Sequence, residues 1–275
     1  MAAVGAVSEQ VPRARSASAQ TGDATDLRLV TEAAYEALAA EYDAPEHSTT
    51  RRLERLSNAL VRSWLEENYA SYDASTNRLR VLEVGCGTGS LTEVMVETIG
   101  AISTIVAIDQ SAAMIAVAGK RLNAKLGKAS ELRLLQQSVY SVGKRHGLAM
   151  FDLVIGGLVD PFLEPEALRC MVGAMHSGSR LVLTTPHRHW ADWERRTRLH
   201  VAPTRTSFRL RDGSTVMPLS FTYLEEDLPA LLGHAGLALH ESRTLSAPAV
   251  VEEGGAGLCV PPRVLLIAAA AARAP

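Results

Sequence analysis

Three glycines end an apolar run in the segment RVLEVGCGTGSLT, which covers residues 80–92. Glycine suits positions where the backbone takes a positive φ or lies against a ligand, because a Cβ atom would clash there. An apolar run, a glycine turn and a helix-like segment are together typical of a nucleotide-type cofactor site in a doubly wound α/β fold. Gly85, Gly87 and Gly89 follow the spacing G-x-G-x-G, and Ser90 stands where the dinucleotide pattern G-x-G-x-x-G has its last glycine.

An acidic residue follows at the end of the next apolar run. Asp109 closes the segment TIVAID and lies 20 residues past Gly89. A carboxylate at this place accepts hydrogen bonds from the two hydroxyls of a ribose. The glycine loop and Asp109 therefore predict a site for a ribose-bearing cofactor.

Strand-like and helix-like segments alternate along most of the chain. The strand candidates are short, largely apolar runs, which is typical of strands buried on both faces of a sheet. Two amphipathic helices, within 26–45 and 49–70, precede them. This pattern predicts an α/β fold with a doubly wound, seven-stranded Rossmann-like sheet. The expected strands are 79–84, 104–108, 132–136, 151–155, 180–184, 238–243 and 263–269, and the expected helices among them are 90–99, 112–126, 165–175 and 225–234.

One interval, residues 186–223, is too long for a simple crossover. It carries a short amphipathic helix and then alternating segments around Asp212 and Gly213, and Asp-Gly is a strong hairpin signal. Ligands of open α/β sheets bind beyond the carboxyl ends of the strands. We therefore interpret 186–223 as a lid or substrate-facing insertion before the last helix and strands. The alternative is a structural flap or an oligomer contact.

The composition is that of an ordinary globular protein. The chain has 275 residues, of which 47% are apolar and 21% charged, which is enough for a core without disulfides or metals. We expect one domain over residues 27–275. Residues 1–26 fit a disordered tail or an organelle transit peptide, and we favour the tail because amphipathic periodicity is absent.

Charge and cysteine usage argue against several classes of function. The formal net charge of -2 provides no field that would hold a polyanion, so we expect no nucleic-acid partner. The cysteines Cys86, Cys170 and Cys259 lack metal-ligand spacing, so we expect no metal site. No apolar window is long enough for a membrane span, and we expect a cytoplasmic protein without a membrane partner. The oligomeric state stays open, a homo-oligomer included.

Several motifs resemble those of class I S-adenosylmethionine-dependent methyltransferases. VLEVGCGTGSLT is similar to the first motif of that family, VAIDQSAAMI to the second and FDLVIGGLVDPF to the fourth. The third motif falls on QQSVYSV, and the resemblance extends from about residue 40 to residue 269. It implies S-adenosyl-L-methionine as the cofactor, and a small molecule as the methyl acceptor.

The resemblance also implies a role for individual residues. Tyr42 or Tyr35 would close over the cofactor, although a tyrosine on an amphipathic helix is more often a packing residue. The other implied cofactor-binding residues are Gly85, Cys86, Gly87 and Gly89 around the methionine and ribose part, Glu83 at the loop or the amino group, Asp109 at the ribose, Gln110 and Met114 along the adenine, Ser138 and Val139 at its edge, and Ile155 and Gly156 beneath the sulfonium.

A general base is needed only when the attacking atom carries a proton. His187 and His189 follow the expected strand 180–184 and are the first candidates, because histidine titrates near neutrality. The alternative is that they face solvent or cap a helix. Asp160 is the second candidate. A flat apolar substrate would contact Trp190, Trp193 and Phe208.

The function predicted from the sequence is methyl transfer to an O, N or C atom of a small metabolite of specialised (natural-product) metabolism. One alternative is a protein of the same fold that binds the cofactor without methylating, as a structural partner or a rearrangement catalyst. An NAD-dependent oxidoreductase is less favoured because the third glycine of the dinucleotide pattern is missing.

Overall fold

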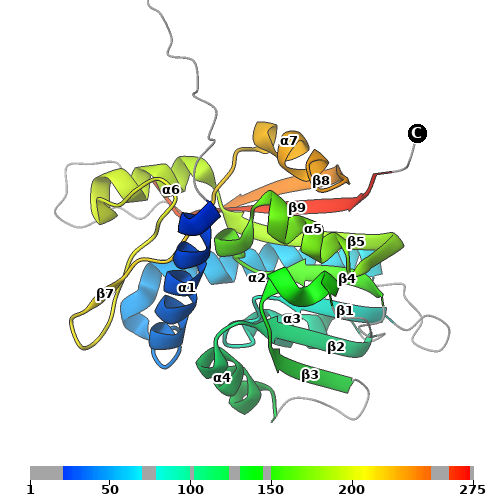
Figure 1. Ribbon diagram of the computed structural model, residues 1–275, viewed down its shortest axis with the longest axis horizontal. Coiled ribbons are helices and arrows are strands. Elements are labelled where there is room, and N and C mark those ends of the chain that lie inside the picture. Colours follow the sequence, from blue (N-terminus) through cyan, green and yellow to red (C-terminus); the bar gives the residue numbers. More distant parts are fainter. Residues whose placement is uncertain are drawn as a thin grey trace, which may run out of the picture.

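The chain folds around a central seven-stranded sheet (Figure 1). The computed structural model describes residues 21–69, 79–99, 102–123, 131–144, 150–248 and 260–272. In the strand order β3-β2-β1-β4-β5-β9-β8 the first five strands are parallel, and β9 is antiparallel to β5 and to β8. The strands are β1 (Leu79–Val84), β2 (Ile102–Asp109), β3 (Glu131–Gln136), β4 (Phe151–Gly156), β5 (Met175–Pro186), β8 (Leu237–Ser246) and β9 (Arg263–Ala271). This order confirms the predicted doubly wound sheet.

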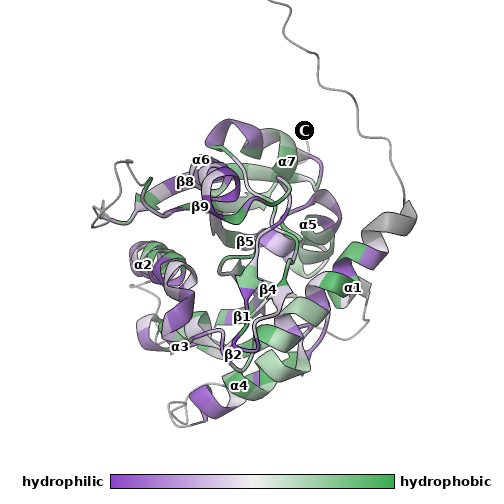
Figure 2. Cartoon of the chain, turned by 90° about the vertical axis from the view of Figure 1, so that its left-hand side faces the viewer, coloured by the Kyte–Doolittle hydropathy of each residue, from purple (hydrophilic) through white to green (hydrophobic). Residues whose placement is uncertain are grey.

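Neighbouring residues of β1 enter different apolar cores. Val81 packs in the core that contains Trp64, whereas Leu82 packs in the core that contains Leu168. A strand covered on both faces is largely apolar, and β1 accordingly carries the apolar residues Leu79, Val81, Leu82 and Val84. In Figure 2 α2 and α3 lie on one side of the sheet and α5 lies on the other. The main helices are α1 (Thr21–Leu38), α2 (Ser48–Tyr69), α3 (Ser90–Thr98), α4 (Ala112–Leu122), α5 (Pro165–Val172), α6 (Arg188–Glu194) and α7 (Leu228–Gly233).

The boundaries of several elements differ from the sequence prediction, and the largest shifts are at the starts of α1 and β5. Helix α1 begins at Thr21, within the segment predicted as a tail, and residues 1–20 lie outside the described residues. From Thr25 to Val30 the helix has no buried residue, so apolar periodicity does not mark its start. Strand β5 begins at Met175, earlier than the predicted start at Arg180, because Met175 already pairs with Phe151 of β4.

The segment 186–223 forms a helix followed by a small hairpin. Helix α6 continues into a π-helical turn over Arg195–Leu199. Strands β6 (Phe208–Arg209) and β7 (Thr215–Val216) then pair across a turn in which Gly213 has a φ of 87°, as the Asp-Gly signal predicted. The hairpin lies beside α1 in Figure 1, and the Leu219 amide donates to Thr31 Oγ1 at 3.0 Å.

Candidate active site

The glycine loop lies at the carboxyl end of β1 and has the conformation that its sequence indicated. Gly85, Gly87 and Gly89 have φ angles of 66°, 51° and 84°. A Cβ atom at Gly87 would meet nothing within 4 Å, so this glycine is required by its backbone conformation and borders open space. A Cβ atom at Gly89 would lie 3.2 Å from the Ala118 Cβ atom. Gly89 therefore permits close packing of the loop on α4.

Asp109 ties the glycine loop to the start of α4. Its Oδ2 atom accepts from the Gly87 amide at 2.9 Å, and its Oδ1 atom accepts from the Ser111 amide at 2.9 Å. Burial raises the pKa of this carboxyl above its usual value, although the two backbone hydrogen bonds oppose the rise. Each oxygen retains capacity for a further donor.

Two small cavities, each of about 50 Å³, adjoin the glycine loop. Tyr42, Gly85, Gly87, Gly157 and Leu158 border both of them. The cavity that we call the Asp109 cavity also contacts Tyr35, Asp109, Gln110, Met114, Val159, Pro161 and Phe162. The cavity that we call the Glu83 cavity also contacts Glu54, Ser57, Asn58, Glu83, Cys86, Thr88, Ser90 and Leu91.

Glu83 is a buried acid beside the glycine loop. Its Oε2 atom accepts a hydrogen bond from Thr92 Oγ1 at 2.5 Å. Burial raises the pKa of Glu83 to about 8, and the bond from Thr92 opposes this rise. At neutral pH the carboxyl therefore carries a proton, and a nearby positive charge would favour its ionisation.

Helix α1 and the residues after it cover both small cavities. The Glu36 carboxylate accepts from Ser111 Oγ at 2.6 Å and from the Ala113 amide at 3.1 Å, at the start of α4. Farther along, Asp43 pairs with Arg121 at 3.0 Å. These contacts hold the tyrosines Tyr35 and Tyr42, whose ring centroids are 6.5 Å apart, over the glycine loop.

A third cavity of about 590 Å³ opens between α1, α6 and the hairpin, and we call it the large cavity. This volume lies in the range of small-molecule sites. Tyr35, Tyr42 and Leu158 border both the large cavity and the Asp109 cavity. Trp190 and Phe208, two of the predicted substrate contacts, line it, whereas Trp193 packs against the core beneath α6.

Asp160 also lines the large cavity, two residues after Leu158. Its residue is 6% exposed, and burial raises its pKa to about 6. A hydrogen bond from Ser220 and the charge of Arg195 act in the opposite direction. A carboxyl with this pKa is ionised at neutral pH and is a stronger base than an ordinary aspartate. The second candidate base thus lines the large cavity, where its charge acts on Tyr35 and Tyr42 at the boundary with the Asp109 cavity.

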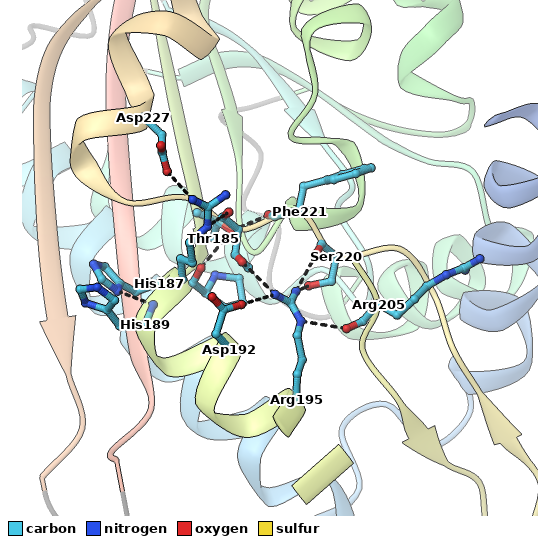
Figure 3. Close-up of polar contacts among 12 residues, drawn as sticks. Thr185, His187, His189, Asp192, Arg195, Arg205, Ser220, Phe221 and Asp227 are labelled. Carbon is cyan, nitrogen blue, oxygen red and sulfur yellow. Dashed lines mark hydrogen bonds and ion pairs between the residues drawn. The ribbon is translucent and has the colours of Figure 1, made fainter. Parts of the chain in front are cut away.

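His187 and His189 lie elsewhere, and this corrects their placement in the site. His187 is buried, its Nε2 atom is 3.0 Å from Glu225 Oε2, and its backbone amide donates to Arg263 of β9. Its Nδ1 atom accepts from the His189 amide, so His187 caps α6. Figure 3 shows both rings well apart from Arg195 and Ser220. Neither histidine is among the described residues that line the three cavities.

The predicted cofactor residues divide into two groups. Those that border the small cavities are Tyr42, Glu83, Gly85, Cys86, Gly87, Asp109, Gln110 and Met114. Those that lie behind them are Gly89, Ser138, Val139, Ile155 and Gly156. Val139 and Ile155 are core residues, and Ser138 Oγ accepts from the Tyr140 amide. At Gly156 a Cβ atom would lie 2.5 Å from Val159 Cγ1, so this glycine permits tight packing after β4.

Sequence reasoning did not identify several residues that border the cavities. Leu158 has a φ of 52°, which is uncommon outside glycine. Its amide donates to Thr184 Oγ1 at 2.8 Å, and Thr184 is hydrogen-bonded to Ser57 of α2 at 2.7 Å. Ser57 and Asn58 stand about 30 residues before the glycine loop. No local pattern relates them to it, and only the packing of α2 places them there.

The fold and the site lead to one family. A family model described as "Methyltransferase domain" matches residues 75–220, which is more than half of the chain. The chain therefore belongs to the methyltransferase-domain family, and the family membership predicted from the sequence is confirmed. No curated protein matches the sequence.

Solved structures share the fold at low sequence identity. A DhpI-SAH complex aligns with a TM-score of 0.56 and 17% identity over 90% of this chain and 98% of the other. Magnesium protoporphyrin IX methyltransferase (ChlM) from Synechocystis PCC 6803 with bound SAM aligns with a TM-score of 0.54 and 16% identity over 94% of this chain and 100% of the other. An S-adenosylmethionine-dependent methyltransferase from Clostridium acetobutylicum ATCC 824 aligns with a TM-score of 0.53 and 14% identity over 80% and 92%.

The described ranges contain neither a candidate membrane span nor a candidate metal site. No helix in them combines the length and the apolar character needed to cross a bilayer. No group of three or more His, Cys, Asp or Glu side chains in them is arranged to hold a metal ion.

Proposed function

We propose that the protein transfers the methyl group of S-adenosylmethionine to a small-molecule acceptor. The observation that carries this proposal is that the Asp109 cavity, the Glu83 cavity and the large cavity all border Tyr42 and Leu158. A donor along the glycine loop and an acceptor in the large cavity would share this boundary. Holding two reactants in line supplies about 7 to 11 kcal/mol in well-oriented reactions. The family membership supports the reaction, and the SAM and SAH complexes of the similar structures support the cofactor.

The residues of the small cavities fit this cofactor. Gly87 leaves open space where a Cβ atom would stand, and Asp109 retains acceptor capacity for ribose hydroxyls. Gln137 does not itself border the small cavities, but it follows β3, and its backbone amide donates to the carbonyl of Asp109, which does, at 2.8 Å. The Gln137 Nε2 atom is buried without a hydrogen-bond partner among the described residues. We assign this donor to the adenine edge, in place of Ser138.

The bound cofactor would supply a methyl group already activated on a sulfonium, so the protein has to bind, orient and move a proton. Asp109 and the glycine loop would hold the ribose side, and Glu83 would pair with the amino group. Tyr35 and Tyr42 exclude water from the shared boundary. Asp160 accepts a proton from an acceptor that carries one.

Turnover and cofactor binding can be tested separately. The protein is incubated with S-adenosylmethionine and pools of amines, phenols and carboxylic acids, and release of S-adenosylhomocysteine is followed. Release above the acceptor-free rate with one pool is the expected result. Calorimetric titrations with S-adenosylhomocysteine and with NAD test the cofactor site. Binding of NAD without binding of S-adenosylhomocysteine would contradict the proposal.

A further inference from the structure

The wall of the large cavity next to the cofactor boundary is aromatic. The ring centroids of Tyr35 and Tyr42 are 6.5 Å apart, and those of Tyr35 and Phe208 are 6.4 Å apart. These three rings, which we call the aromatic wall, come from α1, from the segment after it and from the hairpin. Trp190 of α6 lines the same cavity. The face of an aromatic ring carries partial negative charge and attracts cations.

Two buried carboxyl groups line the same cavity. Asp160 and Glu194 are 6% and 7% exposed. The Glu194 Oε1 atom is 3.8 Å from Arg198 Nε. Asp160 lies nearest in sequence to Leu158, at the boundary with the cofactor cavities. An ionised carboxylate there attracts a cationic or hydrogen-bond-donating acceptor and repels an acceptor that is itself a carboxylate.

Among the described residues that line the large cavity, Arg195 is the buried cation. All of its hydrogen-bond donors are used within the protein (Figure 3). Its Nε atom donates to the Arg205 carbonyl, and its Nη1 atom donates to Asp192 and to Thr222. Its Nη2 atom donates to the carbonyl and the hydroxyl of Ser220. A guanidinium has five N–H groups, so Arg195 has none to offer to an anionic acceptor.

The other arginines that line the large cavity are exposed at its rim: Arg198, Arg209 and Arg211. Arg211 lies 3.6 Å from Glu41 and 3.5 Å from Glu46. Positive charge thus lies at the entrance, while the interior next to Leu158 presents carboxylate oxygens and aromatic faces.

We propose that the methyl acceptor is a primary or secondary amine, which binds as its ammonium ion between Asp160 and the aromatic wall. This inference rests on the proposed function. The Asp160 carboxylate takes one proton from the ammonium nitrogen. The freed lone pair then forms the N–C bond to the methyl carbon as the C–S bond breaks, and the electron pair of that bond stays on sulfur. The products are the N-methylammonium ion, S-adenosylhomocysteine and a proton on Asp160, which passes to water.

Three acceptors of similar size test the inference: phenethylamine, 4-ethylphenol and phenylacetic acid. Release of S-adenosylhomocysteine is measured with each, and we expect release with phenethylamine at least about tenfold faster than with the other two. Faster release with the phenol or with the acid would overturn the inference and leave the proposed function intact. Failure of the protein to bind S-adenosylhomocysteine would instead refute the proposed function.

If none of the three acceptors is methylated, a binding measurement decides. The protein saturated with S-adenosylhomocysteine is titrated with choline and with its neutral isostere 3,3-dimethylbutan-1-ol. We expect choline to bind at least about tenfold more tightly, because aromatic ring faces and the Asp160 carboxylate attract a desolvated cation and not the neutral alcohol. Asp160→Asn should reduce this preference, whereas Asp152→Asn, near the start of β4, should keep it. Equal affinity for choline and the alcohol in the unmodified protein would overturn the inference.

Discussion

The buried guanidinium of Arg195 donates two hydrogen bonds from Nη2 to Ser220, at 2.7 Å to its carbonyl oxygen and at 3.0 Å to its Oγ atom. The Ser220 side chain is also hydrogen-bonded to the Asp160 carboxylate. The Ser220 hydroxyl therefore links Arg195 to Asp160, and both of these residues line the large cavity. The link lowers the pKa of Asp160 from the value that burial alone would set.

Replacement of Ser220 should change the pH dependence of turnover. In Ser220→Ala the ionised Asp160 loses a hydrogen bond, so its pKa rises and the acid limb of the rate profile moves to higher pH. Thr222→Val is the matched control, because Thr222 Oγ1 accepts from Arg195 Nη1 at 3.0 Å but is not bonded to Asp160. The two profiles are compared between pH 5 and 9. An unshifted acid limb in Ser220→Ala would remove Ser220 from this role.

Asp160→Asn should lose activity and gain stability. The pKa of Asp160 is about 6 in the folded protein and about 3.9 in an unfolded chain. The folded state therefore binds the proton more tightly. The free energy of unfolding therefore falls as the pH rises from about 4 to 6. Above pH 6 the total loss is about 2 to 3 kcal/mol. The neutral asparagine side chain does not ionise, so Asp160→Asn avoids this loss of stability. Urea unfolding at pH 7.5 should therefore show Asp160→Asn as more stable than the unmodified protein. At pH 4 the difference should shrink, and a pH-independent difference would contradict the buried ionisation.

Cofactor binding should release a proton from Glu83. Its pKa of about 8 means that it is mostly protonated at pH 7, and a cofactor ammonium group would lower that pKa. Titration of S-adenosylhomocysteine at pH 7 in buffers of different ionisation enthalpy measures the number of protons released. On binding S-adenosylhomocysteine, Glu83→Gln should release up to one proton fewer than the unmodified protein. Equal proton release by both proteins would show that Glu83 does not pair with the amino group.

The contacts of Arg121 should slow the dissociation of the cofactor from the glycine loop. It joins Asp43, at 3.0 Å, to Thr88 of the glycine loop, whose Oγ1 atom accepts from Arg121 Nη1 at 2.9 Å. The Arg121 and Asp43 side chains are about 30% exposed, and such pairs contribute about 0.2 to 1 kcal/mol. Arg121→Ala should therefore speed dissociation of S-adenosylhomocysteine by a few fold in stopped-flow measurements. Arg62→Ala, which breaks a surface pair with Glu97, is the control and should leave this rate unchanged.

The sheet and the glycine loop could be predicted because their signals are local. The apolar runs mark the central strands, such as β1 and β4, which are buried on both faces. The positive φ angles of the loop require glycine wherever the chain turns in this way. Asp109 was found for the same reason, since it ends the strand that lies next to β1.

The large cavity could not be predicted residue by residue, because its lining comes from segments far apart in the chain. His187 and His189 follow β5, which made them candidates, but the cap of α6 turns His187 toward Glu225. The bonds of Arg195 depend on how the segment after α6 folds back, which no local pattern records. Asp160 was predicted, although its pKa depends on burial by partners distant in sequence.

The affinity of Asp109→Ala for S-adenosylhomocysteine tests the central claim most directly. If Asp109 holds the ribose, calorimetry should show a loss of about 2 to 4 kcal/mol of binding free energy, because a pair of charge-assisted hydrogen bonds is removed. Asp152→Ala is the matched control: Asp152 accepts from the Arg80 amide at the amino-terminal ends of β4 and β1, away from the glycine loop, and the variant should bind as the unmodified protein does. Near-native affinity in Asp109→Ala would contradict the account of the cofactor site.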